Sequence, residues 1–193
     1  MKALQICTLT ALLAPLQLLI APNSYAGTPM VFNGNPTVSG NGTAGTTALW
    51  EDVAELNGQS VDVVLRVVSV TSGATVDFFT ANDDARARVE YGTASGIVFA
   101  TVNYEFFVAN TFGTGSEERI TIIPSAVYKD IDNAADETLI VVSDDMAAYT
   151  RETPSNIQVT VNGSNTEFTS DANGTELDKN LAVQIDFNPT DII

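Results

Sequence analysis

Residues 60–70 read SVDVVLRVVSV, and the odd-numbered positions from 61 to 67 are all valine or leucine. In an extended strand successive side chains point to opposite sides, so these four apolar residues share one face. The other face carries Asp62 and Arg66 beside two valines, which leaves it partly apolar as well. This period of two predicts a strand with at least one face in a core.

Further β-prone runs follow at intervals of about 8–15 residues, separated by Gly, Asn, Asp and Pro. The longest, residues 96–109, reads GIVFATVNYEFFVA and is the candidate central strand. The others span residues 74–80, 85–91, 119–123, 126–131, 137–142, 156–161, 166–170 and 181–187. The spacing predicts an all-β fold: a single antiparallel β-sandwich of about eight to eleven strands, Ig-like or jelly-roll-like. We expect its core to include Trp50, Val63, Leu65, Phe99 and Val183.

Three segments are ambiguous. Residues 49–56, LWEDVAEL, fit either a helix or a strand that enters the core with Trp50 as its anchor. A short helical turn is possible at residues 144–148. Residues 33–47, NGNPTVSGNGTAGTT, are typical of a flexible linker or long loop, and they separate the strand-like residues 29–32 from the body.

The first 26 residues have the organisation of a signal peptide. Lys2 precedes an apolar stretch, and Ser24-Tyr25-Ala26 places small residues where a signal peptidase cleaves. A membrane anchor is the alternative, but Pro15 and polar residues interrupt a core that needs about 20 apolar residues to span. We therefore expect a secreted protein, extracellular, at the cell surface or periplasmic, with no membrane span after cleavage. Residues 27–47 then form the N-terminal strand and flexible segment, and residues 48–193 the sandwich domain.

Charge and composition exclude several functions. Without the leader the chain has seven basic and 24 acidic residues, a net charge of −17. Nucleic acids and anionic lipids require clustered Lys and Arg, and the chain has no such cluster. Histidine is absent, which excludes Ser-His-Asp catalysis and histidine-bound zinc. The single cysteine, Cys7, lies in the leader, so the exported chain forms no disulfide.

The densest acidic cluster lies in YKDIDNAADET, residues 128–138. Its candidate calcium ligands are Asp130, Asp132, Asn133, Asp136 and Glu137. Closely spaced Asp and Asn in a loop supply the oxygen ligands that Ca²⁺ prefers, although the EF-hand pattern is not followed. The alternative is a solvated acidic turn between two strands. Residues 171–178, DANGTELD, are a weaker candidate, because Asn-Gly is first a hairpin sequence.

Aromatic residues suggest a second kind of site, because rings stack on sugar faces. The candidates are Phe78, Phe79, Phe99, Tyr104, Phe106 and Phe107. Neighbouring residues of a strand face opposite sides, so one ring of each Phe-Phe pair should fill the core. The other should face outward or a second layer. Core packing is the alternative role for most of these rings.

The strand sequences VDVVLRVVSV, VDFFT and YEFFVA, the turn YKDIDN…DET and the leader resemble β-sandwich modules of bacterial cell-surface and extracellular proteins. The resemblance covers residues 49–187 and implies a role as spacer, adhesive unit or matrix component. We expect a non-catalytic structural or adhesive protein whose partners are copies of itself or other matrix components. A further expectation is that residues 29–32 complete a neighbour's sheet and so form filaments. The alternatives are that this segment folds onto its own sheet or stays disordered. The opposed function class is a glycan-binding protein or a carboxylate-dependent glycosidase.

Overall fold

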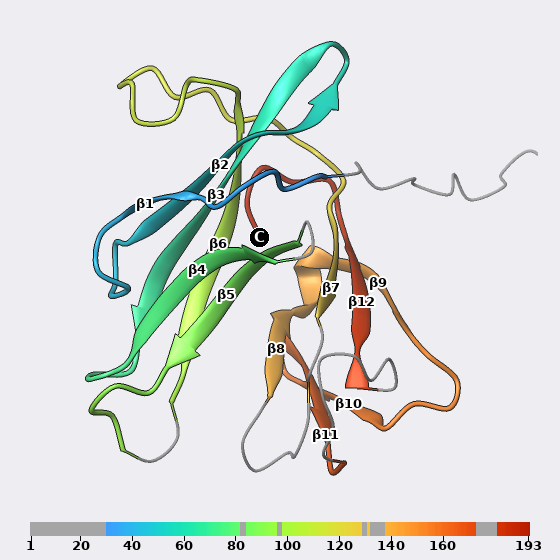
Figure 1. The fold of residues 1–193 in the computed structure, drawn as a ribbon. Helices are drawn as coiled ribbons and strands as arrows, with labels where there is room; N and C mark the ends of the chain where they lie inside the picture. Colours follow the sequence, from blue (N-terminus) through green and yellow to red (C-terminus); the bar gives the residue numbers. More distant parts are fainter. Residues whose placement is uncertain (1–29, 82–83, 96–97, 129–130, 132–137, 173–180) are drawn as a thin grey trace, which may run out of the picture.

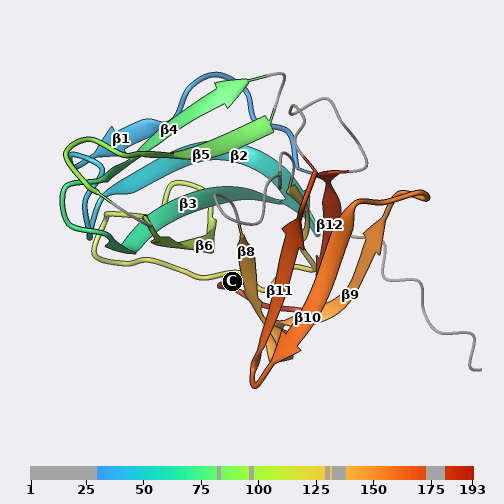
Figure 2. The ribbon, with the colours of Figure 1, turned by 90° about the horizontal axis from the view of Figure 1, so that it is seen from below.

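The computed structural model describes residues 30–81, 84–95, 98–128, 131, 138–172 and 181–193. These residues form twelve strands and a short 3-10 helix, η2 (Ser143–Asp145) (Figure 1). All strand pairs are antiparallel. The predicted all-β, antiparallel sandwich class is confirmed. The strands are divided between two pairs of packed sheets, which we call the first and second lobes (Figure 2).

The first lobe contains a four-stranded sheet with the order β1 (Thr37–Ser39), β2 (Thr47–Leu56), β3 (Gln59–Val70) and β6 (Ala100–Val108). The hairpin of β4 (Thr75–Ala81) and β5 (Asp84–Glu90) covers one face of this sheet. The predicted core residues Trp50, Val63 and Leu65 are buried between the two layers. The Trp50 Nε1 donates a hydrogen bond to Thr80 Oγ1 at 2.7 Å, which joins the sheet to the hairpin.

The second lobe packs two three-stranded sheets against each other. One has the order β10 (Ile157–Asn162), β11 (Asn165–Ser170), β8 (Leu139–Val142), and the other β7 (Ser125–Tyr128), β12 (Val183–Phe187), β9 (Met146–Arg151). The alternation predicted for residues 181–187 is observed, because Val183, Ile185 and Phe187 point into this core. Val183 is therefore a core residue, as expected.

The two lobes are joined along the outer edge of β6. Ile193 pairs with Tyr104 there, through N–H···O bonds of 2.9 and 2.7 Å. Ile120 N donates to Phe106 O at 3.0 Å on the same edge, and Ile122 pairs with Thr190. The side chain of Ile193 packs against both core clusters. The last residues of the chain thus return from the second lobe to the first (Figure 1).

Two expectations about residues 96–109 are corrected. Phe99 is 59% exposed and is not a core residue. The observed strand, β6, begins at Ala100, four residues after the predicted start, so Phe99 belongs to the preceding loop. β6 is also not central among the named strands, because it pairs with β3 on one edge and its other edge receives only isolated bridges.

Two of the ambiguous segments take different forms, one a strand and the other a helical turn followed by a strand. Residues 47–56 form β2, and a bulge at residues 51–53 disturbs the alternation that a regular strand would show. A helical turn, η2, begins one residue before the predicted position, and β9 follows at Met146.

The segment predicted as a linker or long loop, residues 33–47, contains β1 and is tied to the first lobe. Asn35 Oδ1 accepts a hydrogen bond from Thr80 N, and Gly42 O accepts one from Val76 N. Before it, Val31 N donates to Val53 O of β2 at 2.8 Å. The Phe32 ring meets Trp50 edge-on, with centroids 5.7 Å apart. Residues 30–32 thus lie on their own sheet, one of the alternatives that the sequence left open.

Candidate functional site

The predicted calcium ligands Asp130, Asp132, Asn133, Asp136 and Glu137 lie outside the described residues, as does the predicted signal peptide. Within the ranges that the structure describes, no three His, Cys, Asp or Glu side chains come together as a metal site would require. Asp171, from the weaker candidate loop, accepts a hydrogen bond from Gln158 Nε2 at 2.7 Å. The calcium site therefore stays a prediction.

Two carboxylates are buried on the face of the first sheet that is turned away from the hairpin, Asp62 and Glu105. Asp62 accepts hydrogen bonds from the backbone N–H groups of Asp52 and Asn110, both at 2.9 Å. Both of these residues have positive φ, +52° and +63°. Asp62 thus holds the β2 bulge and the chain leaving β6 in place.

Glu105 binds two arginines. Its Oε1 accepts from Arg66 Nε at 2.6 Å, and its Oε2 accepts from Arg66 Nη2 and Arg119 Nη2, each at 3.1 Å. The hydrogen bond to Glu105 raises the pKa of Arg66 above its usual value. The arginines also lie over rings, Arg66 over Phe112 and Arg119 over Phe107. Every carboxylate oxygen of Asp62 and Glu105 is therefore bound by a protein donor, which is the arrangement of structural rather than reacting groups.

The other end of the first lobe has a different character. Three loops lie there: residues 40–46, residues 71–74, and the described part of the loop after β5, residues 91–95 and 98–99 (Figure 1). Hydrogen bonds connect them to each other and to the adjoining strands, from Val76 N to Gly42 O, Thr93 N to Gly73 O and Thr71 N to Phe99 O. None of the 24 acidic and eight basic residues of the chain lies in these loops. We call this surface the uncharged end.

Glycines allow the loops of the uncharged end to pack closely. A Cβ at Gly92 would lie 2.3 Å from Gly73 O, and one at Gly42 would lie 2.7 Å from Val76 O. Both glycines also have positive φ, which L-residues with side chains rarely adopt. The close fit and the inter-loop hydrogen bonds make the uncharged end a fixed surface rather than a set of independent loops.

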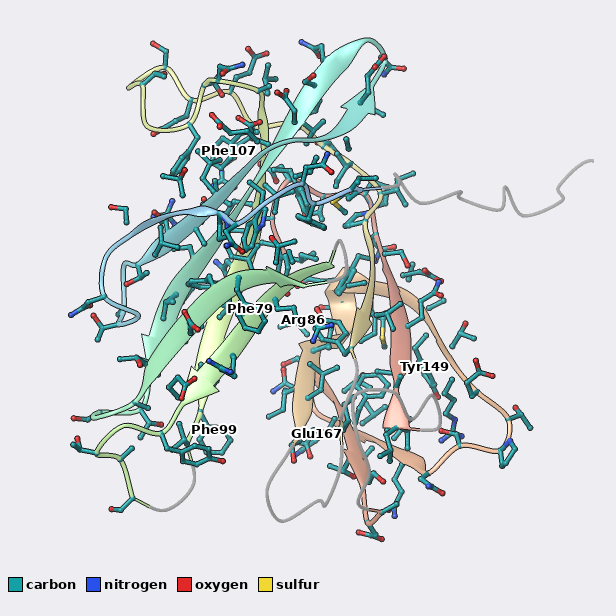
Figure 3. The ribbon with its side chains drawn as sticks, viewed as in Figure 1. Phe79, Arg86, Phe99, Phe107, Tyr149 and Glu167 are labelled. Atoms are coloured by element: carbon teal, nitrogen blue, oxygen red, sulfur yellow. The ribbon has the colours of Figure 1, made fainter. Side chains whose placement is uncertain are left out.

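Two aromatic side chains project from this fixed surface. Phe99 is 59% exposed and Tyr91 56% exposed. The backbone of Phe99 is held on both sides, since its N–H donates to Thr71 Oγ1 at 2.9 Å and its carbonyl accepts from Thr71 N at 2.9 Å. Tyr91 O accepts from Ala94 N at 2.8 Å. Figure 3 shows Phe99 and Phe107 at opposite ends of β6.

The remaining sugar-stacking candidates have other roles. Phe78 and Phe106 are core residues, and Phe79 lies outside the core beneath Arg88, 5.4 Å from its guanidinium carbon. Phe107 is buried on the opposite face, in a second layer with Phe112. This confirms the expected division of each Phe-Phe pair. Sequence reasoning missed Tyr91. The absence of charge from residues 91–104 was the one feature of the sequence that could have marked this region.

The described residues include no helix long and apolar enough to cross a membrane. No described protein family matches the chain, and no curated protein does so significantly. Among solved structures, the fold is similar to the N-terminal domain of the Streptococcus gordonii adhesin Sgo0707, with a TM-score of 0.50 and 13% sequence identity. The match covers 83% of this chain and 45% of the adhesin chain, so this chain spans less than half of that structure.

Proposed function

We propose that this protein is a non-catalytic adhesive or structural protein of the bacterial surface or extracellular matrix. The observation that carries the proposal is the uncharged end, a rigid surface on which Tyr91 and Phe99 are exposed. Binding residues are commonly placed on loops that a rigid scaffold holds in position. The solved domain of similar fold belongs to an adhesin, which supports the same class.

A non-catalytic role agrees with the chemistry of the described side chains. The chain has no histidine. The two carboxylates buried in the first lobe, Asp62 and Glu105, are engaged by backbone amides and arginines. Proton transfer by either group would break contacts that hold loops of the first lobe, which favours binding over hydrolysis.

The function is tested in the native bacterium. Deleting the gene should reduce the number of cells that remain attached to a surface after washing, and expression of the wild-type protein from a plasmid should restore it. An inactive copy with a stop codon after the leader is the matched control. Attachment that is unchanged by the deletion would refute an adhesive role.

Filament formation by strand donation is a finer proposal about assembly. Residues 30–32 contact β2 through one backbone hydrogen bond and the Phe32–Trp50 contact. The same segment of another copy would make the same contacts if the two copies exchanged segments. Val31→Pro removes the N–H that donates to Val53 O, whereas Val31→Ala keeps it. Electron microscopy of extracellular material should show filaments for Val31→Ala and none for Val31→Pro. Filaments formed equally by both variants would rule out donation by this segment.

Calcium binding by Asp130, Asp132, Asn133, Asp136 and Glu137 is proposed from the sequence alone. An ion that binds only the native state raises the melting temperature by mass action. Millimolar calcium should therefore raise it relative to a chelator at matched ionic strength, and Asp132→Asn should reduce the increase. An unchanged melting temperature in the wild type would leave the cluster as an acidic turn.

A further inference from the structure

We propose that the uncharged end binds a neutral polysaccharide, with the rings of Phe99 and Tyr91 stacked on sugar faces. The inference rests on the proposed adhesive function and names its partner. It does not follow from exposure of the two rings alone, since single exposed apolar side chains are common on protein surfaces. Four properties of this surface carry it: its charge, its polar groups, its size and its rigidity.

The charge argument concerns what the uncharged end attracts. The chain carries a net charge of −16, but the 18 described residues of the three loops contribute none of it. A polyanion would be repelled by the rest of the molecule and would find no Lys or Arg on these loops. A cationic partner would find no carboxylate on them. The chemistry of the surface therefore fits an uncharged ligand.

The polar groups fit the hydroxyl rim of a sugar. Exposed hydroxyl and amide side chains lie on the same three loops, at Asn41, Thr43, Ser72, Thr93 and Ser95. Tyrosine with serine, glycine and asparagine is also the composition of antibody binding loops, where rings supply contact area and small polar residues supply adaptable hydrogen bonds. A pyranose presents both kinds of partner, with apolar C–H faces and a polar edge.

The size of the surface favours a sugar chain over a folded protein. Twelve described residues of the three loops are exposed. A stable protein–protein interface uses about 20–30 residues on each side. The backbone that carries the rings is also held in place before binding, because Phe99 is bonded to Thr71 and the loop of Tyr91 is joined to Gly73 through Thr93. Less conformational entropy is then lost on binding, which suits a ligand with few contacts.

The test measures binding of the full-length secreted protein to soluble dextran, yeast mannan and mixed-linkage β-glucan, with alginate as the anionic comparison. Affinity electrophoresis compares wild type with Phe99→Ala, Tyr91→Ala and the double variant. Tyr149→Ala is the matched control, because Tyr149 is a 41% exposed ring on β9 of the second lobe. Melting temperatures of all variants establish that each is folded.

The wild type should bind at least one neutral polymer more tightly than alginate, and moderate salt should leave this binding unchanged. Phe99→Ala and Tyr91→Ala should each bind about tenfold more weakly than the wild type. Tyr149→Ala should bind like the wild type. Failure to bind any of the three neutral polymers would overturn the inference, as would unchanged binding by the double variant. If cells that express the double variant lose attachment only to protein-coated surfaces, the partner is a protein and the inference is wrong. The gene-deletion experiment does not depend on these results, so it tests the adhesive function separately.

Discussion

At the scale of single residues, the first lobe depends on buried carboxylates. Asp62 is 1% exposed and accepts hydrogen bonds from two backbone N–H groups, those of Asp52 and Asn110. These two bonds compensate its charge. Such carboxylate–amide bonds are stronger than neutral hydrogen bonds, and they replace the bonds to water that burial removes.

Replacing Asp62 by alanine should lower the free energy of unfolding by about 2–3 kcal/mol, because the two partly buried hydrogen bonds from Asp52 N and Asn110 N are lost. The matched control is Asp77→Ala. Asp77 is exposed and pairs with the equally exposed Arg88 at 3.2 Å, so its loss should change stability by about 1 kcal/mol or less. Urea unfolding followed by Trp50 fluorescence measures both. Equal effects of the two substitutions would contradict the structural role of Asp62.

Two partly buried tyrosines should make the protein sensitive to alkali. Burial raises the pKa of the Tyr104 hydroxyl, and burial together with the nearby Tyr104 raises the pKa of Tyr128. Above about pH 10 the unfolded chain releases these protons while the folded protein retains them, so stability falls as pH rises.

The fall should reach about 1.4 kcal/mol per pH unit for each tyrosine. Tyr104→Phe combined with Tyr128→Phe should flatten this dependence between pH 9 and 11, and should leave the profile from pH 6 to 8 with its wild-type shape. The midpoints of urea unfolding from pH 6 to 11 measure this pH dependence. A double variant with the wild-type alkaline slope would show that other groups cause the loss.

At the scale of elements, the loops of the uncharged end depend on the packing of glycines. Gly92 has a φ of +54°, and its missing side chain leaves room for Gly73 O. Gly163 in the β10–β11 turn has a similar φ of +63°, but nothing lies within 4 Å of a Cβ there. The two positions therefore separate backbone strain from close approach.

Gly163→Ala should destabilise the protein by about 1–2 kcal/mol, the strain of placing a side chain in the left-handed region. Gly92→Ala should destabilise the protein by at least about 1 kcal/mol more than Gly163→Ala, because its Cβ also displaces the Gly73 turn. Thermal melting of both variants measures the difference. Equal effects would mean that the two turns separate easily and that the uncharged end is not rigid.

At the scale of the whole molecule, the lobes are coupled through the last residues of the chain. Ile193 contacts both core clusters while Ile192 beside it is 37% exposed. Tyr104 on β6 and Tyr128 on β7 lie close enough to influence each other's ionisation. The lobes thus share a boundary that unfolding must break.

Ile193→Ala should lower stability by about 1–3 kcal/mol, since a partly buried side chain leaves a gap next to both cores. Ile192→Ala should have a free energy of unfolding within about 0.5 kcal/mol of the wild type. The single tryptophan, Trp50, reports on the first lobe, whereas circular dichroism reports on both. With Ile193→Ala the two transitions should separate. Coincident transitions at the wild-type midpoint would show that Ile193 does not couple the lobes.

The sequence by itself determined that the chain is built mainly of strands, and it determined which side of the strands at residues 61–67 and 181–187 is apolar. The alternation at residues 61–67 and 181–187 placed Val63, Leu65 and Val183 in cores, because it is a local property of an extended backbone. The same local reasoning identified Trp50 as a core anchor and divided the Phe-Phe pairs correctly. It also established that loops near residues 40, 72 and 95 carry no charge.

Only the tertiary structure decided what covers the second face of each strand and which loops meet. Asp62 is buried because Asn110, 48 residues later, donates to it. Residues 47–56 are a strand because β3 pairs with them. Phe99 is exposed because Thr71 holds its backbone at the end of the sheet, where no opposing layer covers the ring. Local periodicity specifies a direction for each side chain, but burial depends on contacts between residues distant in the sequence, and no local pattern contains them.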